Sequence, residues 1–134
     1  MSPVPRRASE AAQVSNLNLF SICTLDRLEL KRLKEYTFQV AVTQFAESQG
    51  WRVQYWRKSA AAGVNGRYVG LGPAGWPDVV LLRGPRMICI ECKAERGTVT
   101  PEQQACLEAL SRVQGVDVYI ARPRDAAELM EILQ

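Results

Sequence analysis

Two apolar runs that flank Gly84-Pro85 constrain the fold of this chain more than any other feature. Residues 78–83 and 86–93 are rich in Val, Leu and Ile, and a Gly-Pro pair between such runs is typical of a turn between strands. We therefore predict two antiparallel strands joined by a tight turn. If the pair forms the centre of that turn, opposing residues have numbers that sum to 169.

A helix and a further strand follow these two strands. Thr100 is a typical N-cap, Pro101 takes the first helical position, and Gln103 completes a capping box. The apolar face of this helix consists of Leu107, Leu110 and Val113. Because residues 116–120 alternate as a strand does, the helix at 101–114 is predicted to be a right-handed crossover between two parallel strands.

The remaining segments complete an α/β pattern of the order αβββαβα. In chain order they are a helix over 26–49 ended by Gly50, a strand at 51–56, a long glycine-rich connection at 57–77 and a last helix at 125–133. Residues 1–25 are expected to be an N-terminal tail or arm, partly flexible. Residues 26–134 are expected to form one domain.

The absence of histidine excludes several classes of active site. The chain has no Ser–His–Asp or Cys–His catalytic arrangement, no histidine general base and no zinc site with a histidine ligand. Its 134 residues contain neither an apolar run of about 18 residues nor an apolar signal peptide at the start. We therefore expect no membrane partner and a cytoplasmic, reducing setting.

Cys89 and Cys92 form a Cys-x-x-Cys pair that is predicted not to be a zinc or redox site. On a strand, these two positions point to opposite faces, so their side chains cannot share a metal ion or a disulfide. Cys23 and Cys106 form no second pair. All four are expected to be small buried apolar residues.

One stretch of the chain is basic although the net charge is only +3. Between Glu47 and Glu91 the only acid is Asp78, and the bases are Arg52, Arg57, Lys58, Arg67, Arg83 and Arg86. Such a stretch is typical either of a phosphate-facing surface or of an ordinary solvated loop. The candidates for contact with a nucleic acid are Arg57, Lys58, Arg67 and Tyr68.

The predicted register also brings two carboxylates together. Asp78 and Glu91 would face each other with Cβ atoms about 4.5–5.5 Å apart, which is destabilising unless a cation lies between them. Lys93 lies two residues beyond Glu91 and hence on the same face, and Mg²⁺ is the other obvious partner. Alternatively, the two acids end their strands and point into water.

These residues also match a known motif. Pro77-Asp78, a gap of twelve residues and Glu91-Cys92-Lys93 match the bipartite motif of the PD-(D/E)XK nucleases. The wider series resembles the VRR-NUC branch, which includes small stand-alone phage and bacterial proteins. In order, this series is Glu35-x-x-Phe38-Gln39, Gly50-Trp51, Gly75-x-Pro77-Asp78, Glu91-x-Lys93, Gly97, Thr100-x-x-Gln103 and Arg122-Pro123. The resemblance covers about residues 34–133 and implies a restriction-endonuclease-like αβββαβ core with a mixed central sheet flanked by helices.

The resemblance implies a role for each matched residue. The implied ligands of Mg²⁺, or of Mn²⁺ as its substitute, are Asp78, Glu91, the main-chain carbonyl of Cys92 and Glu35, the last directly or through water. Lys93 would position the attacking water or help to deprotonate it. Gln103 would orient Lys93 or a phosphate.

The expected function is metal-dependent hydrolysis of phosphodiester bonds in DNA, including structured or branched DNA, with RNA left open. A bound cation stabilises the charge of the transition state and activates a water without histidine. The alternative is a non-catalytic nucleic-acid-binding module on a nuclease scaffold. A homodimer is also expected, because one site must cut two strands and because an apolar group lies near the start: Leu17, Leu19, Phe20 and Ile22.

Overall fold

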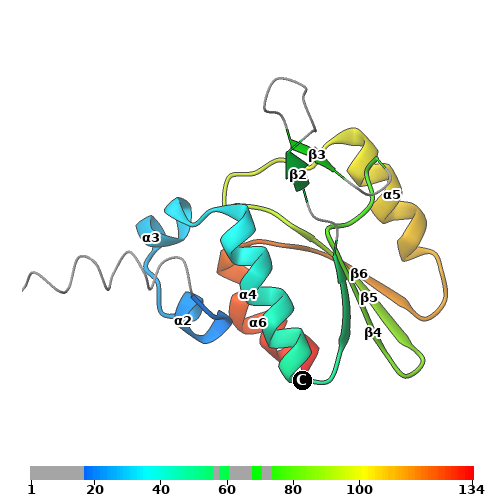
Figure 1. Ribbon diagram of the computed structural model, residues 1–134, viewed down its shortest axis with the longest axis horizontal. Helices are drawn as coiled ribbons and strands as arrows, with labels where there is room; N and C mark the ends of the chain where they lie inside the picture. Colours follow the sequence, from blue (N-terminus) through cyan, green and yellow to red (C-terminus); the bar gives the residue numbers. More distant parts are fainter. Residues whose placement is uncertain (1–16, 56–57, 61–67, 71–73) are drawn as a thin grey trace, which may run out of the picture.

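The computed structural model describes residues 17–55, 58–60, 68–70 and 74–134 (Figure 1). Its helices are α2 (Leu19–Cys23), α3 (Arg27–Arg32), α4 (Glu35–Ser48), α5 (Pro101–Ser111) and α6 (Ala126–Leu133), with a 3-10 turn, η1 (Pro123–Asp125). Its strands are β1 (Arg52–Tyr55), β2 (Lys58–Ala60), β3 (Tyr68–Gly70), β4 (Val79–Arg83), β5 (Arg86–Cys92) and β6 (Val116–Ala121). In these ranges no helix has the length and apolar character needed to cross a membrane.

A four-stranded mixed sheet forms the centre of the molecule. Its strand order is β1-β4-β5-β6. Strand β4 is antiparallel to both β1 and β5, whereas β6 is parallel to β5. Helix α5, which connects β5 to β6, lies on one side of the sheet, and α4 and α6 lie on the other (Figure 1). The prediction of an α/β fold with a mixed sheet flanked by helices is confirmed.

The register around the β4–β5 turn is the predicted one. Val80 pairs with Cys89, and Leu82 pairs with Met87. Gly84 has a φ of +57°, a conformation that suits glycine in a tight turn. The turn residues therefore fix which side chains of the two strands face each other.

Alternation along the central strands separates the apolar core from a polar face. Val79, Leu81, Ile88 and Ile90 are fully buried in one cluster with residues of α2, α4 and α6. Because side chains alternate, Glu91 points the other way, towards α5. The central strands thus provide a core on one side and a polar site on the other.

The predicted single helix over 26–49 is wrong in its middle, where Leu33 and Lys34 separate α3 from α4. Both residues are extended, with ψ values of 125° and 147°. Leu33 is only 4% exposed, so this turn of the chain places its side chain in the core. The break contains neither Gly nor Pro. It follows from the burial of Leu33, which overrides the helical propensity of the neighbouring residues.

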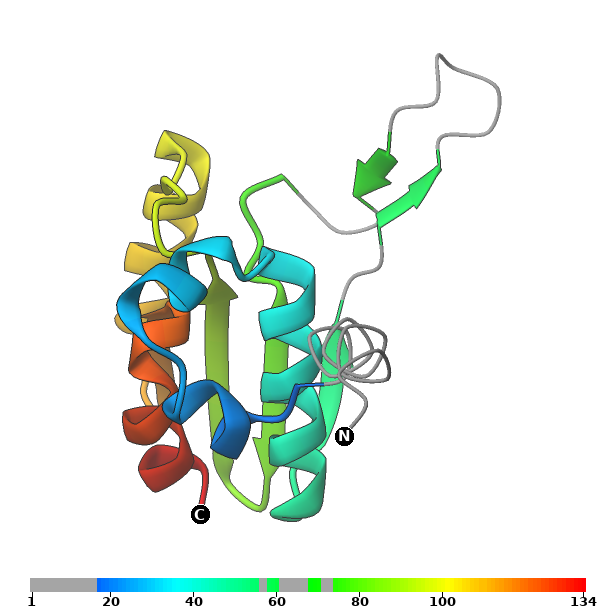
Figure 2. The ribbon, with the colours of Figure 1, turned by 90° about the vertical axis from the view of Figure 1, so that its left-hand side faces the viewer.

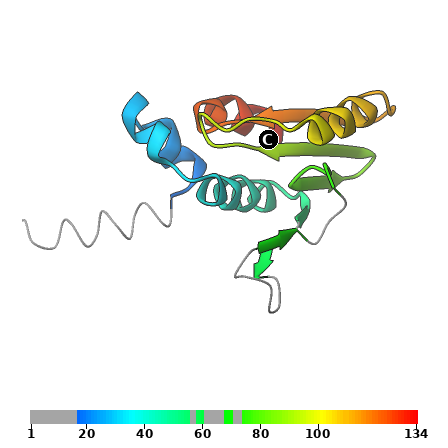
Figure 3. The same ribbon diagram turned by 90° about the horizontal axis from the view of Figure 1, so that it is seen from above.

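The segment predicted as a connection over 57–77 contains a second, two-stranded sheet. Strands β2 and β3 are antiparallel, and Ser59 pairs with Val69. Figures 2 and 3 show both strands standing away from the main sheet. The prediction of a connection without strands is therefore wrong for these residues.

The apolar residues near the start pack mainly within their own chain. Leu19 and Ile22 are buried in the core, and Leu17 packs against it. Phe20 is 64% exposed, and its ring meets that of Phe45 edge-on at 5.9 Å between centroids. This apolar group no longer argues for a second copy of the chain.

The four cysteines are free. Cys92 belongs to the core cluster, whereas Cys89 lies near Cys106 of α5, which confirms that the Cys-x-x-Cys pair points to opposite faces. Cys23 is exposed at the end of α2 and Cys106 is only half-buried, contrary to the expectation that all four would be buried. The neighbours Leu19 and Ile22 fill the core side of this short helix, which leaves Cys23 on its outer side.

Candidate active site

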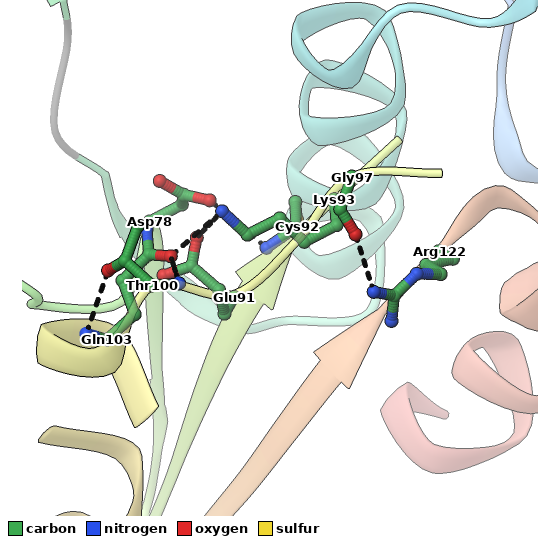
Figure 4. Close-up of polar contacts among 8 residues, drawn as sticks. All are labelled: Asp78, Glu91, Cys92, Lys93, Gly97, Thr100, Gln103 and Arg122. Carbon is green, nitrogen blue, oxygen red and sulfur yellow. Dashed lines mark hydrogen bonds and ion pairs between the residues drawn. The ribbon is translucent and has the colours of Figure 1, made fainter. Parts of the chain in front are cut away.

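The side chains of Asp78 and Glu91 lie together at one end of the β4–β5 pair (Figure 4). Asp78 directly precedes β4, and its Oδ2 accepts a hydrogen bond from the main-chain N–H of Cys92 at 3.1 Å. Because Val79 pairs with Ile90, the next two opposing positions of the strands are those of Asp78 and Glu91. The structure therefore contains the two adjacent carboxylates that the register predicts.

Glu91 is the most deeply buried acid in the described part of the chain, at 1% exposure. Burial, and after it the adjacent carboxyl of Asp78, raise the pKa of Glu91 to about 9, while Lys93 acts in the opposite direction. Oε1 of Glu91 is buried and has no hydrogen-bond partner among the described residues. Two ionised carboxylates in this position repel each other, so the pair requires a proton or a cation between them.

Lys93 is held at the site by α5. Its side chain is 10% exposed, and Nζ donates a hydrogen bond to Oε1 of Gln103 at 2.9 Å and lies 3.9 Å from Oε2 of Glu91. Gln103 is fixed in turn by Thr100, whose N–H donates to the same amide oxygen at 3.0 Å. The predicted capping box is confirmed, and it aims the amide of Gln103 at the lysine (Figure 4).

Glu35 approaches the site from the helix on the opposite face of the sheet. It is the first residue of α4 and is half-buried. Its charge raises the pKa of Glu91, which places it near the carboxylate pair. A direct or water-mediated contact of Glu35 with a metal ion stays a prediction.

Asp78 and Glu91 fit a cation that keeps much of its water. No group of three or more His, Cys, Asp or Glu side chains is arranged to hold a metal ion in the ranges that the structure describes. Mg²⁺, however, is usually bound by one or two carboxylates and retains several waters. The pair provides two such groups and one buried oxygen without a partner, which agrees with that ligand set.

Cys92 contributes its backbone to the site, and its thiol belongs to the core. Its N–H holds Asp78 in place. Its side chain is fully buried, and burial raises the pKa of the thiol well above its usual range, which keeps it protonated. The role of its carbonyl as a metal ligand stays a prediction.

Gly75 brings the loop that leads to Asp78 against α5, and sequence analysis included it only as one residue of the matched series. Gly75 has a φ of +80°, and a Cβ atom there would lie 2.5 Å from the carbonyl oxygen of Glu102. Trp76 has a buried Nε1 without a hydrogen-bond partner in the described part of the chain. The Gly-x-Pro-Asp pattern was a signal for this approach, but its contact with the first turn of α5 depends on tertiary structure.

The predicted nucleic-acid contacts fall only partly within the described residues. Lys58 lies on β2 and Tyr68 lies on β3. Arg57 and Arg67 lie outside the described residues. Contact of these four residues with a nucleic acid stays a prediction.

Comparisons of the chain with protein-family models, with curated proteins and with solved structures give no match. A function for the site therefore rests on its geometry and on the resemblance of its motif to that of the PD-(D/E)XK nucleases.

Proposed function

We propose that this chain is a divalent-metal-dependent nuclease of the VRR-NUC type that hydrolyses phosphodiester bonds in DNA. Support comes from the adjacent carboxyls of Asp78 and Glu91, the buried Lys93 beside them and the amide of Gln103 that orients it. The order α4, β1, β4, β5, α5, β6 is compatible with the restriction-endonuclease-like αβββαβ core that the resemblance implies.

The single observation that carries the proposal is the unpaired Oε1 of Glu91 next to a second carboxyl. A buried acid beside another acid lowers the stability of the fold, and an apolar residue would fill the same space at a lower free energy. Strongly perturbed acids of this kind are concentrated at functional sites. A cation bound by both groups explains why the chain keeps them together.

The side chains of the site have separate roles in hydrolysis. When bound by Asp78 and Glu91, Mg²⁺ would stabilise charge on the phosphate and lower the pKa of a water. The ammonium of Lys93 has three donors, of which Gln103 takes one, so the others are available to hold the attacking water or a phosphate oxygen. The N–H of Cys92 keeps Asp78 aimed at the site. None of these roles needs histidine.

Cleavage of defined nucleic acids tests the proposal. Linear, flap and four-way-junction DNA, with RNA of the same sequence, are incubated with the protein in Mg²⁺ and in EDTA. We expect cleavage of DNA only with Mg²⁺, and a loss of about 100-fold or more in Lys93→Ala, because a positioned donor at the developing charge is removed. Arg112→Ala is the control, since this exposed cation follows the far end of α5.

Wild-type protein that binds DNA without cutting it in any divalent metal contradicts the nuclease proposal. That result supports the alternative function, a non-catalytic nucleic-acid-binding module. Equal cleavage by wild type and Lys93→Ala would mean that the active residues lie elsewhere.

A further inference from the structure

A basic groove opens at the end of the sheet where the chain leaves the candidate active site. It has a volume of about 520 Å³ and lies between α3, the loop after β5 and η1. Its lining residues are Arg27, Leu30, Lys31, Glu95, Arg96 and Arg124. Four bases and one acid leave a surplus of three positive charges in the groove.

The parallel pair of strands explains why the groove residues of the two loops meet. Because β5 and β6 are parallel, the loops at their carboxyl ends lie at the same edge of the sheet. The first loop supplies Glu95 and Arg96, and the second supplies Arg124. Arg122 ties the two loops together, since its Nη2 donates a hydrogen bond to the carbonyl oxygen of Gly97 at 2.7 Å (Figure 4). The sheet topology and this hydrogen bond thus fix the two loops that form one side of the groove.

The positive charge of the groove is mostly uncompensated. Within the described part of the chain, Arg27, Lys31 and Arg96 make no ion pair, and Glu95 lies 3.9 Å from Nη1 of Arg124. The side chain of Glu95 is only 10% exposed, and its buried Oε2 accepts no hydrogen bond from the described residues. The side chain of Arg124 is 60% exposed, so all four bases of the groove face solvent. Like charges gathered in this way destabilise the fold unless an anion binds among them.

We propose that this groove is a phosphate-binding subsite for the backbone of the nucleic acid that the active site cuts, an inference that rests on the proposed function. Arg96 lies three residues after Lys93, so their Cα atoms are at most about 11 Å apart. Successive charges of one DNA strand are about 3.4 Å apart along the helix axis. The groove therefore lies within a few nucleotides of the bond that is cut.

The chemistry of the groove favours phosphate over other anions. Guanidinium groups present paired donors that match phosphate oxygens, and here Arg27, Arg96 and Arg124 approach from three separate elements. Lys31 adds a compact charge on the same side of α3 as Arg27, because residues four apart in a helix are neighbours.

Removal of the two charges on α3 tests the subsite. Arg27→Gln and Lys31→Gln are combined, because both side chains are exposed and the contact between Glu95 and Arg124 stays intact. Affinity for a fluorescein-labelled DNA duplex is measured by anisotropy at several NaCl concentrations. Every protein in the comparison also carries Lys93→Ala, which prevents cleavage during the measurement.

The matched control removes the same charge at the opposite end of the sheet. Arg52 and Arg112 are both exposed; Arg52 pairs with Leu82 near the β4–β5 turn, and Arg112 follows α5 shortly before β6 begins. We expect about tenfold weaker binding for the α3 variant, with a salt slope shallower by about one to two. The Arg52→Gln, Arg112→Gln control should remain within about twofold of its parent. Equal losses in the two double variants would overturn the proposal.

Two further measurements separate the possible failures. Thermal unfolding with inorganic pyrophosphate in EDTA detects a free anion, and an oligoglutamate peptide detects an acidic protein partner. If the α3 variant loses protection by pyrophosphate but binds DNA as the control does, or if the wild type binds oligoglutamate as tightly as DNA, the subsite does not serve a nucleic acid.

The nuclease proposal and the subsite fail in distinguishable ways. Mg²⁺-dependent cleavage by the wild type, together with equal DNA binding by both double variants, contradicts the subsite alone. A specific binding loss in the α3 variant without any cleavage by the wild type contradicts the nuclease alone. Arg96→Gln repeats the binding test from the loop after β5, so that a folding defect in α3 does not decide the result.

Discussion

The ammonium group of Lys93 donates a hydrogen bond to Oε1 of Gln103 at 2.9 Å and lies 3.9 Å from Oε2 of Glu91. The amide is neutral, so it fixes the direction of the lysine without cancelling its charge. Because Gln103 belongs to the capping box of α5, the first turn of that helix sets the position of the lysine relative to the carboxylates.

Gln103→Ala removes this acceptor and should lower the cleavage rate about 10- to 100-fold, the usual effect of losing a group that orients a site residue. Thr100→Ala is the control, because it removes the helix cap, which costs about 1 kcal/mol, but keeps the amide. Single-turnover cleavage and thermal unfolding are measured for both variants. Equal loss of rate in the two would show that Gln103 acts only through the stability of α5.

The raised pKa of Glu91 predicts a pH-dependent stability in EDTA. Its value in the folded protein is about 9, against 4.5 for an ordinary glutamate. Between these two values the folded state binds more protons at this group than the unfolded chain does. Below pH 4.5 this group should therefore cause no change of the free energy of unfolding with pH. Above pH 4.5 it should make the free energy of unfolding fall as the pH rises towards 9. Urea unfolding at a series of pH values measures this slope.

Glu91→Gln isolates the contribution of this group, because an amide does not titrate. We expect a smaller loss of stability with rising pH in the variant than in the wild type. Mn²⁺ should restore stability to the wild type at high pH and leave the variant nearly unchanged, since a ligand that binds only the folded state stabilises it. Identical pH curves for the two proteins would show that Glu91 is not held in the environment described above.

Gly75→Ala should displace the loop that leads to Asp78. The positive φ alone costs about 1–2 kcal/mol for an L-residue, and the new Cβ would also overlap the carbonyl oxygen of Glu102. Gly84→Ala is the control, since Gly84 also has a positive φ but has no atom within 4 Å of the added Cβ. We expect a larger loss of stability and of cleavage in Gly75→Ala, measured by thermal unfolding and by the Mg²⁺-dependent rate. Equal effects of the two substitutions would contradict a tight contact with α5.

Local sequence signals were sufficient where a few adjacent residues decide the structure. The Gly84-Pro85 turn gave the register of β4 and β5, and through it the placement of Asp78 opposite Glu91. The start of α5 was predictable because a capping box is formed by residues three positions apart.

Features that depend on distant contacts were not predictable from these patterns. The break between α3 and α4 follows from burial of Leu33. The basic groove joins Arg27, Arg96 and Arg124, which are far apart in the sequence. Arg96 and Arg124 meet because β5 and β6 are parallel, and Arg27 joins them through the packing of α3. The pKa of Glu91 depends on how deeply the fold buries it, which no local pattern records.

Calorimetric titration of Mn²⁺ into wild type, Asp78→Asn and Lys93→Ala tests most directly the claim that Asp78 and Glu91 hold a divalent cation. The asparagine keeps an oxygen that can accept the N–H of Cys92, so it removes the charge with little change in shape. We predict saturable binding by the wild type, binding at least as tight in Lys93→Ala, where a competing positive charge is gone, and loss of binding in Asp78→Asn. No binding by the wild type, or equal affinity in Asp78→Asn, would contradict the claim.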